Sequence, residues 1–231
     1  MCVCSALVLA GSDAWAAGIE VPAVKLVHRD LVEPLPDKAW PRGEAHAYAV
    51  RRFDRGKSRE LIHIEDMAQV RGFYPDDKYL GSFETVAALV YRSRDLEALR
   101  EFARRLAFNV LIGNGDAHLE NWSLIYRDPR VPTLAPAYDL VATAVYRPAN
   151  LGQEDLGLKL GGSRRFEIVT LSTFDAIDKK LGARADLASV VASFVSRVIA
   201  EWPRAAEILE PNDKLMKEIE RHIVERAQAF R

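Results

Sequence analysis

One amphipathic segment, residues 95–112, constrains the fold of this chain more than any other feature of the sequence. Apolar residues recur along it at helical spacing and fall on one face, which carries Leu96, Leu99, Ala103, Leu106 and Val110. The opposite face carries Glu97, Arg100, Glu101, Arg104 and Arg105. This pattern predicts a helix that packs on one side only. Gly113 and Gly115 then bracket Asn114, and because glycine permits positive φ, we expect a tight loop to begin there.

Shorter patterns predict the other elements. Strands are expected at residues 23–27 and 45–53, which we expect to pair, and a β-hairpin is expected at 122–126 and 133–134. Helices are expected at 5–17, 63–71, 83–91, 172–182, 186–202 and 212–230. The chain is therefore predicted to be α+β, with a reduced N-terminal β lobe at residues 1–55 and a mainly helical C-terminal lobe at residues 56–231.

Composition excludes several classes of protein and of partner. A chain of 231 residues that is 49% apolar can bury a sizeable core, which excludes a disordered protein. Lys and Arg number 32 against 33 Asp and Glu, so the net charge of −1 supplies no basic arm, and we expect no direct binding to nucleic acid. No stretch approaches the roughly 18 consecutive apolar residues of a membrane helix, so we expect no membrane association.

The chain has two cysteines, Cys2 and Cys4, which lie too close together in sequence to staple a fold or to complete a four-ligand zinc site. This usage fits a reducing compartment, and we expect a cytoplasmic protein. Residues 3–16 have two features of a secretory signal, an apolar run and a small-residue motif. That interpretation is disfavoured, because no basic residue precedes Lys25.

The residues best suited to chemistry follow the predicted helix. Phosphoryl transfer needs a carboxylate that orients the attacking hydroxyl, and oxygen ligands that hold Mg²⁺ against the phosphates. Asp116 is followed five positions later by Asn121, and Asp139 lies beyond the predicted hairpin, which is the order of a protein-kinase catalytic loop. The structural alternatives are that Asp116 caps the broken helix, that Asp139 caps the next segment and that His118 is a hydrogen-bonded brace.

Further blocks of sequence extend this pattern. They read VRRFDR at 50–55, IEDMAQ at 64–69, YPDDKY at 74–79, GNGDAHLENWS at 113–123 and LAPAYD at 134–139. In this order they resemble the kinase domain of the HipA-type toxin kinases. The resemblance implies a two-lobed serine/threonine protein kinase fold that uses ATP and Mg²⁺, and a role as the toxin of a toxin–antitoxin pair.

The resemblance also implies roles for single residues. Asp116 would be the catalytic base, Asn121 and Asp139 would hold Mg²⁺, and His118 would lie near the phosphates. Nucleotide contacts are implied for Tyr138 and for a hinge whose backbone meets the adenine, made of Arg51, Arg52 and Phe53.

Two positions depart from the family pattern. Arg51 stands where the family often has Glu, and Glu120 stands where it often has Lys or Arg, which removes a positive charge from beside the phosphates. Glu65 and Asp66 are implied to form a structural acidic pair on a helix beneath the site.

Parts of a kinase nucleotide site are not visible in the sequence. A kinase of this type needs a Gly-rich loop over the phosphates and a strand lysine, yet Lys25 stands past the expected position. The helix expected at 5–17 carries Asp13 rather than the glutamate that would pair with that lysine. We therefore interpret the chain as N-terminally truncated, and we expect it to bind Mg²⁺-ATP weakly and to show almost no turnover.

Three hypotheses are compatible with the sequence. The chain is a kinase completed by another polypeptide or by sequence lost at its start, or it is an inactive kinase-like remnant that binds a partner. The third hypothesis, a metal-dependent hydrolase, has less support, because nothing supplies a second set of metal ligands. The resemblance implies a protein substrate, for which an aminoacyl-tRNA synthetase is the family-level expectation. The expected partner chain is a DNA-binding antitoxin or a complementing N-terminal chain.

Overall fold

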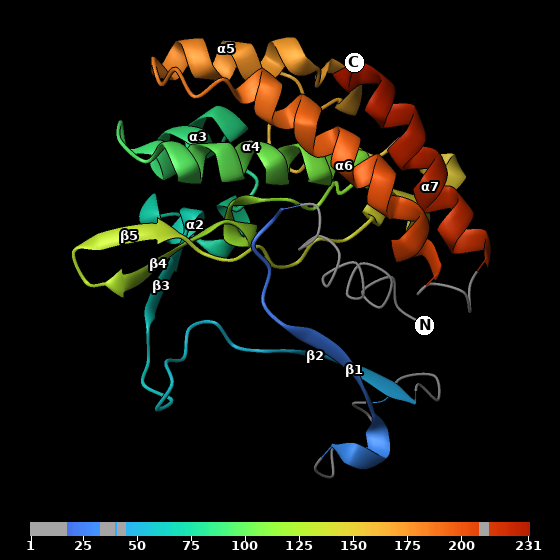
Figure 1. Cartoon of the computed structure of the whole chain (residues 1–231), viewed down its shortest axis with the longest axis horizontal. Helices are drawn as coiled ribbons and strands as arrows, with labels where there is room; N and C mark the ends of the chain where they lie inside the picture. Colours follow the sequence, from blue (N-terminus) through green and yellow to red (C-terminus); the bar gives the residue numbers. More distant parts are fainter. Residues whose placement is uncertain (1–17, 33–39, 41–44, 208–212) are drawn as a thin grey trace.

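Helix α4 (Leu96–Leu111) forms over the amphipathic segment and lies in the middle of the helical part of the molecule (Figure 1). The computed structural model describes residues 18–32, 40, 45–207 and 213–231. The Asp95 side chain caps α4 by accepting a hydrogen bond from the Ala98 amide at 3.0 Å. Four residues of the predicted apolar face are fully buried, namely Leu99, Ala103, Leu106 and Val110.

The charged face of α4 is partly buried as well, so the prediction of one-sided packing is wrong in part. Glu101 and Arg105 are only 9% and 4% exposed. Arg105 Nε donates to Glu101 at 2.7 Å, and its Nη1 donates to the Ala135 carbonyl at 2.6 Å. Glu101 also accepts a hydrogen bond from the Glu20 amide at 3.0 Å. Because both charges have partners, both can be covered, and hydrophobic periodicity alone does not reveal this.

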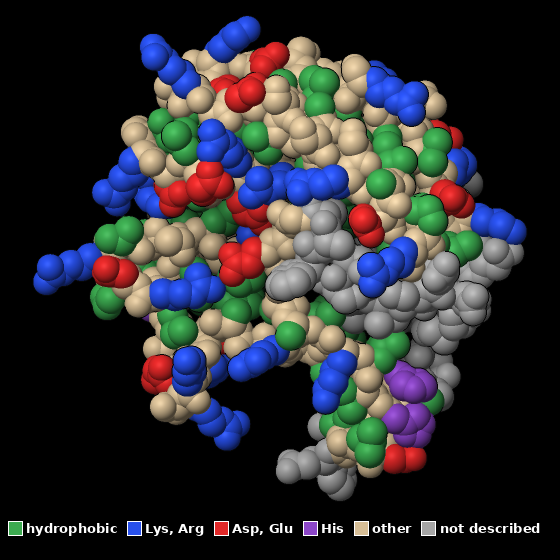
Figure 2. Space-filling view, viewed as in Figure 1, with side chains coloured by type: hydrophobic (Ala, Val, Ile, Leu, Met, Phe, Trp, Pro, Cys, Tyr) green, Lys and Arg blue, Asp and Glu red, His purple; other side chains and the backbone are tan. Residues whose placement is uncertain are grey.

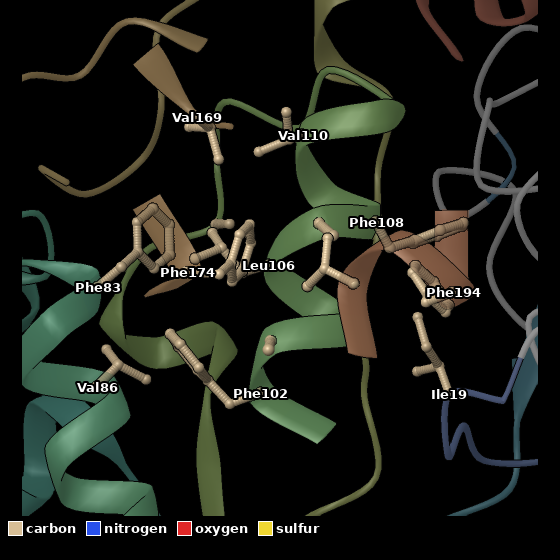
Figure 3. Close-up of a cluster of buried hydrophobic side chains, with 14 of the residues drawn as sticks. Ile19, Phe83, Val86, Phe102, Leu106, Phe108, Val110, Val169, Phe174 and Phe194 are labelled. Atoms are coloured by element: carbon tan, nitrogen blue, oxygen red, sulfur yellow. The ribbon is translucent and has the colours of Figure 1, made fainter. Parts of the chain in front are cut away.

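Four further helices pack on α4 or on one another, and they confirm the helices predicted at similar positions: α3 (Phe83–Tyr91), α5 (Leu171–Leu181), α6 (Leu187–Glu207) and α7 (Asp213–Ala227). Figure 3 shows Phe83, Leu106 and Phe174 meeting in the core between these elements. The Phe108 ring lies 6.4 Å from the Phe194 ring, which joins α4 to α6. The predicted helical part of the chain therefore has one common core.

Strands β1 (Val24–His28) and β2 (His46–Val50) form the predicted antiparallel pair. The resulting ribbon projects from the helical part of the molecule (Figure 1). β2 ends at Val50, before the predicted limit, although the Arg51 amide still donates to the Ala23 carbonyl at 2.8 Å. Within the part of the chain that the structure describes, no third strand joins this sheet.

The helix predicted at residues 63–71 is wrong in its first half. Residues His63–Asp66 form strand β3, and Met67–Val70 form the short helix α2. β3 pairs antiparallel with β4 (Ser123–Asp128), which also pairs with β5 (Val131–Leu134) in the predicted hairpin. The partner of β3 is distant in sequence, so local periodicity could not distinguish this strand from the start of a helix.

Glu65 and Asp66 therefore lie on a strand and at a helix cap, and not on one helix. The Asp66 side chain accepts a hydrogen bond from the Gln69 amide at 2.8 Å, and the Gln69 side chain accepts one from the Asp66 amide at 3.0 Å. This is a capping box that begins α2. Glu65 accepts a hydrogen bond from the Tyr126 hydroxyl at 2.5 Å, so both carboxylates have structural contacts.

Short 3₁₀ helices connect these elements, at Arg29–Leu31, Pro75–Asp77, Leu119–Asn121, Thr143–Tyr146, Ala149–Leu151, Phe166–Ile168 and Gln228–Phe230. The architecture is mixed α+β, as predicted. In the described ranges, no helix is long and apolar enough to cross a membrane. The helix expected at 5–17 and the signal-like segment at 3–16 lie outside the described residues.

The variant Leu106→Ala tests the assignment of α4 as the core helix. Leu106 is fully buried, so its truncation should lower the free energy of unfolding by about 2–5 kcal/mol. Leu61→Ala is the matched control, because Leu61 is 76% exposed and its truncation should change that free energy by less than about 0.5 kcal/mol. Urea unfolding followed by circular dichroism measures both. Equal losses in the two variants would contradict the assignment.

Candidate active site

The loop after α4 turns at two glycines that are required for different reasons. Gly113 has a φ of +67°, and a Cβ there would lie 2.7 Å from the Ala144 Cβ. Gly115 is not in the positive-φ region, but a Cβ on it would lie 2.5 Å from Glu154 Cγ. The predicted tight loop is confirmed. Its first glycine is needed for backbone conformation, and its second is needed for close packing.

Asn114, between these glycines, links three parts of the site. Its side chain is buried, and its Oδ1 accepts a hydrogen bond from the Asp116 amide at 3.0 Å. Its Nδ2 donates to Asn109 Oδ1 at 2.8 Å and lies 3.4 Å from the Asp139 carbonyl oxygen. The end of α4, the Asp116 loop and the Asp139 segment therefore meet at one amide. Sequence reasoning gave Asn114 no role, because these partners come together only in the fold.

Asp116 projects from this loop with its side chain 50% exposed. The Tyr79 hydroxyl donates a hydrogen bond to Oδ1 of Asp116 at 2.5 Å. Burial and this neighbouring carboxylate raise the pKa of Tyr79 to about 12, so the phenol is protonated at neutral pH. Tyr79 ends the YPDDKY block, but the sequence carries no signal that it contacts a residue 37 positions later.

His118 lies beside Asp116 and is buried, with its Nε2 3.8 Å from Asp116 Oδ1. Its ring meets the Tyr79 ring edge-on, with the two ring centres 5.1 Å apart. Burial lowers the pKa of His118, so the imidazole is neutral at pH 7. The ring therefore supports the loop by packing, and the hydrogen-bonded brace is not supported, because Nδ1 of His118 is buried without a hydrogen-bond partner among the described residues.

Asn121 and Asp139 are in direct contact. Asn121 ends the short helix Leu119–Asn121, and its Nδ2 donates to Asp139 Oδ2 at 2.9 Å. Asp139 has a φ of +55°, a left-handed conformation that non-glycine residues adopt rarely. Its side-chain partner is Asn121 rather than a backbone amide, so the helix-cap alternative for Asp139 has no support in this contact. The return of Asp139 beside Asn121 follows from the β4–β5 hairpin.

This pair fits a Mg²⁺ ion. Neighbouring ligands in an octahedral Mg²⁺ shell lie about 3 Å apart, since each is about 2.1 Å from the ion. The 2.9 Å contact has this spacing, and a half-turn of the Asn121 amide would present its oxygen beside the Asp139 carboxylate. Among the described residues no group of three or more His, Cys, Asp or Glu side chains could hold a metal. Further ligands would therefore come from water and from phosphate oxygens, as is usual for Mg²⁺.

A cleft of about 480 Å³ opens beside Tyr138, the residue that precedes Asp139. Its lining is made of Val50, Arg51, Arg52, Phe53, Asp54, Ile64, Asp66, Gln69, Ser123 and Tyr138. The Phe53 ring stacks on the Tyr138 ring with their centres 5.9 Å apart, and Tyr138 directly precedes Asp139. Figure 2 shows the surface hollowed beside the β1–β2 ribbon, with Lys and Arg side chains along its borders. The three predicted hinge residues therefore line the same cleft as Tyr138.

Tyr138 is fixed by hydrogen bonds as well as by stacking. Its hydroxyl donates to the Glu120 carbonyl at 2.7 Å and shares a hydrogen bond with the Ser123 hydroxyl. Burial raises the pKa of Tyr138 to about 12, so this hydroxyl is protonated at neutral pH. The contact ties the floor of the cleft to the segment that carries Asn121.

Asp54 follows the hinge residues and holds two arginines. Its carboxylate is largely buried, with 12% of the side chain exposed. Arg52 Nε donates to Asp54 Oδ1 at 2.8 Å, and Arg55 Nη1 donates to Oδ2 at 2.6 Å. The hydrogen bonding from Arg52 holds the pKa of Asp54 down at about 2. The pairing fixes the Arg52 guanidinium at the side of the cleft.

Comparison with known proteins shows the family of the chain. The family model of the HipA-like C-terminal domain matches residues 9–202. The chain belongs to this family. A protein of Sinorhizobium fredii named "Putative kinase Y4dM" is 40% identical over 191 residues, which cover 81% of this chain and 44% of that protein. The serine/threonine-protein kinase toxin HipA of Shewanella oneidensis is 32% identical over 125 residues, which cover 45% of this chain and 29% of the toxin.

A solved structure shares the fold of this HipA-like chain. The complex of HipA, HipB and operator DNA from Shewanella oneidensis contains a chain that matches with a TM-score of 0.75. The match covers 98% of the present chain and 55% of the other, at 21% identity, so it bears on the fold alone. The HipA-like chain spans 44% of the Sinorhizobium relative and 29% of the Shewanella toxin. The resemblance to HipA-type kinases is therefore confirmed.

The variant Asp54→Asn tests the ion pairs of the hinge. It should destabilise the protein at neutral pH, because Arg52 and Arg55 lose their charged partner. The folded-state pKa of about 2 lies below the unfolded value of about 4, so the stabilisation from ionised Asp54 is complete above pH ~5 and is lost as the pH falls toward ~2. Urea unfolding of both proteins across this pH range measures the difference. A stability gap that does not narrow in acid would contradict the assigned ion pairs.

Proposed function

We propose that this HipA-like chain binds Mg²⁺-ATP and transfers the γ-phosphoryl group to a serine or threonine hydroxyl of a protein substrate. The observation that carries the proposal is the 2.9 Å contact between Asn121 and Asp139, beside a cleft floored by stacked aromatic rings. Asp116 lies on the loop that leads to Asn121 and is half exposed. We further propose that residues 1–55 and 56–231 are the two lobes of a kinase-like fold, with this cleft at their junction.

The cleft residues would hold the nucleotide. In this proposal the adenine lies against Phe53 and Tyr138, and the backbone of Arg51 and Arg52 meets its polar edge. An aromatic floor suits a flat base, because ring stacking is favourable without requiring a particular base. Arg51 replaces a residue that is often Glu in this family, and a backbone contact does not depend on the side chain.

The loop residues would carry the chemistry. Asn121 and Asp139 would hold Mg²⁺, which neutralises charge on the phosphates when it is bound. Asp116 would accept the proton of the acceptor hydroxyl while the oxygen bonds to the γ-phosphorus and the bond from that phosphorus to the ADP oxygen breaks. His118 would remain neutral near the phosphates and support the loop.

The proposed partners follow from the relatives. One relative bears the name of a serine/threonine-protein kinase toxin, and the matched structure is a complex of HipA with HipB and operator DNA. These names support a DNA-binding antitoxin as the partner of this chain, and a complementing N-terminal chain is the other candidate. The family resemblance supports an aminoacyl-tRNA synthetase as the protein substrate, and a cytoplasmic location fits an ATP-dependent reaction.

A second candidate is a kinase-like chain that binds a partner without catalysis. It is favoured by the position of Lys25, which is exposed on β1 and is not among the residues that line the cleft. Electrostatic contacts to the phosphates supply most of the stabilisation in phosphoryl transfer. A cleft without such a lysine would hold the nucleotide and yet transfer its phosphoryl group slowly.

Asn121→Ala and Asp139→Ala test the proposed metal pair. Each removes one ligand, and a charge-assisted contact worth about 1.5–3 kcal/mol corresponds to roughly a ten- to hundredfold loss of ATP affinity in the presence of Mg²⁺. Asp175→Ala is the matched control, because Asp175 is an exposed carboxylate on α5. Isothermal titration calorimetry with Mg²⁺ and with EDTA measures the affinities. ATP binding that needs no Mg²⁺, or that survives both substitutions, would contradict the site.

Asp116→Asn tests the proposed base. Transfer by the 231-residue chain is expected to be very slow, and loss of a general base should slow it by a further 10²- to 10⁴-fold or so, with ATP affinity unchanged. Radiolabelled transfer from [γ-³²P]ATP measures the rate, and Asp175→Asn is the control. A transfer rate unaffected by Asp116→Asn would exclude Asp116 as the base. Rapid transfer that Asp116→Asn abolishes would contradict the second candidate, the kinase-like chain without catalysis.

A further inference from the structure

The hydroxyl of Tyr79 makes the closest polar contact to the proposed base. It lies 2.5 Å from Oδ1 of Asp116, whereas the next group, Nε2 of His118, lies 3.8 Å from the same oxygen. Across the described residues, no other side chain is hydrogen-bonded or ion-paired to this carboxylate. The Asp116 side chain is half exposed, and both contacts are made to Oδ1 rather than to its second oxygen, Oδ2.

Tyr79 is itself held firmly against the loop. Arg164 donates to the Tyr79 carbonyl at 2.8 Å and to the Gly157 carbonyl at 2.9 Å, so one guanidinium fixes two segments. The Leu119 amide donates to the carbonyl of the preceding residue, Lys78, at 3.1 Å. The Tyr79 ring also packs edge-on against buried His118. The hydroxyl therefore reaches Asp116 from a backbone that is already fixed in place.

This arrangement fixes the orientation of the carboxylate. A carboxylate on an exposed loop can rotate about its Cβ–Cγ bond, and a short hydrogen bond to one oxygen restricts that rotation. The phenol is protonated at neutral pH, because its pKa is raised to about 12, so it acts as a donor and does not compete for the substrate proton. The oxygen that Tyr79 does not hold is left as the acceptor.

We propose that Tyr79 is a positioning residue that holds Oδ1 of Asp116 and thereby presents Oδ2 to the acceptor hydroxyl. The inference rests on the proposed phosphoryl transfer and deepens it, since it names the group that orients the base. Correct orientation of a reacting group greatly raises the reaction rate, and a misplacement of about 1 Å can lower that rate roughly a hundredfold.

The test compares Tyr79→Phe with Tyr126→Phe in the 231-residue chain. The second variant is a matched control, because the Tyr126 hydroxyl donates to a carboxylate, Glu65, over the same 2.5 Å but outside the site. The probe is phosphoryl transfer from [γ-³²P]ATP to dephosphorylated casein. Tyr79→Phe should lower the transfer rate constant about tenfold to a hundredfold, with the half-saturating ATP concentration unchanged. Tyr126→Phe should change neither value.

A second measurement separates this inference from the proposed function. In protein labelled with ¹³Cζ-tyrosine, the resonance that disappears in Tyr79→Phe should move when Asp116→Asn removes the charged acceptor. It should not move in Asp175→Asn, which alters the exposed carboxylate on α5. Absence of transfer in the unaltered chain would count against the proposed function alone, and the resonance would then decide the inference. Two results would contradict the inference. One is a Tyr79 chemical shift that does not change in Asp116→Asn, and the other is a Tyr79→Phe variant that transfers phosphate as fast as the unaltered chain.

Discussion

The buried amide of Asn114 is the contact on which the candidate site depends. Its oxygen holds the Asp116 amide, and its nitrogen reaches Asn109 at the end of α4 and the Asp139 carbonyl. A buried amide is expensive to leave unpaired, so the three segments are constrained to meet at one point. The helix supplies the rigid base, and two loops supply the functional side chains.

The buried ion pair between Glu101 and Arg105 connects the site to the segment around Glu20. The Glu101–Arg105 pair on α4 holds the Glu20 amide and the Ala135 carbonyl, and the Glu20 carbonyl in turn accepts a hydrogen bond from the Ala137 amide at 2.7 Å. Breaking a buried ion pair by removing one partner is strongly destabilising. The segment just before Tyr138 and Asp139 is thereby fixed between α4 and the segment that leads to β1.

Sequence patterns predicted the elements whose structure depends on neighbouring residues. They did not predict the features that depend on contacts between residues far apart in sequence. The α4 periodicity and the β4–β5 hairpin are local, so both could be predicted. The spacing of Asp116, Asn121 and Asp139 could be read directly from the sequence. Strand β3 was predicted as a helix, because its pairing with β4 is a long-range contact. The burial of Arg105 and the contacts of Tyr79 and Asn114 likewise depend on residues far away in sequence, for which spacing carries no signal.

The central claim is that Asn121, Asp139 and the aromatic cleft form one Mg²⁺-nucleotide site. The most direct test is anomalous X-ray diffraction from crystals of the chain grown with Mn²⁺ and a non-hydrolysable ATP analogue, since Mn²⁺ can replace Mg²⁺ among oxygen ligands. The account predicts a metal peak about 2.1 Å from the side-chain oxygens of Asn121 and Asp139, with the adenine against Phe53 and Tyr138. A nucleotide bound elsewhere, or a metal peak away from this pair, would contradict it.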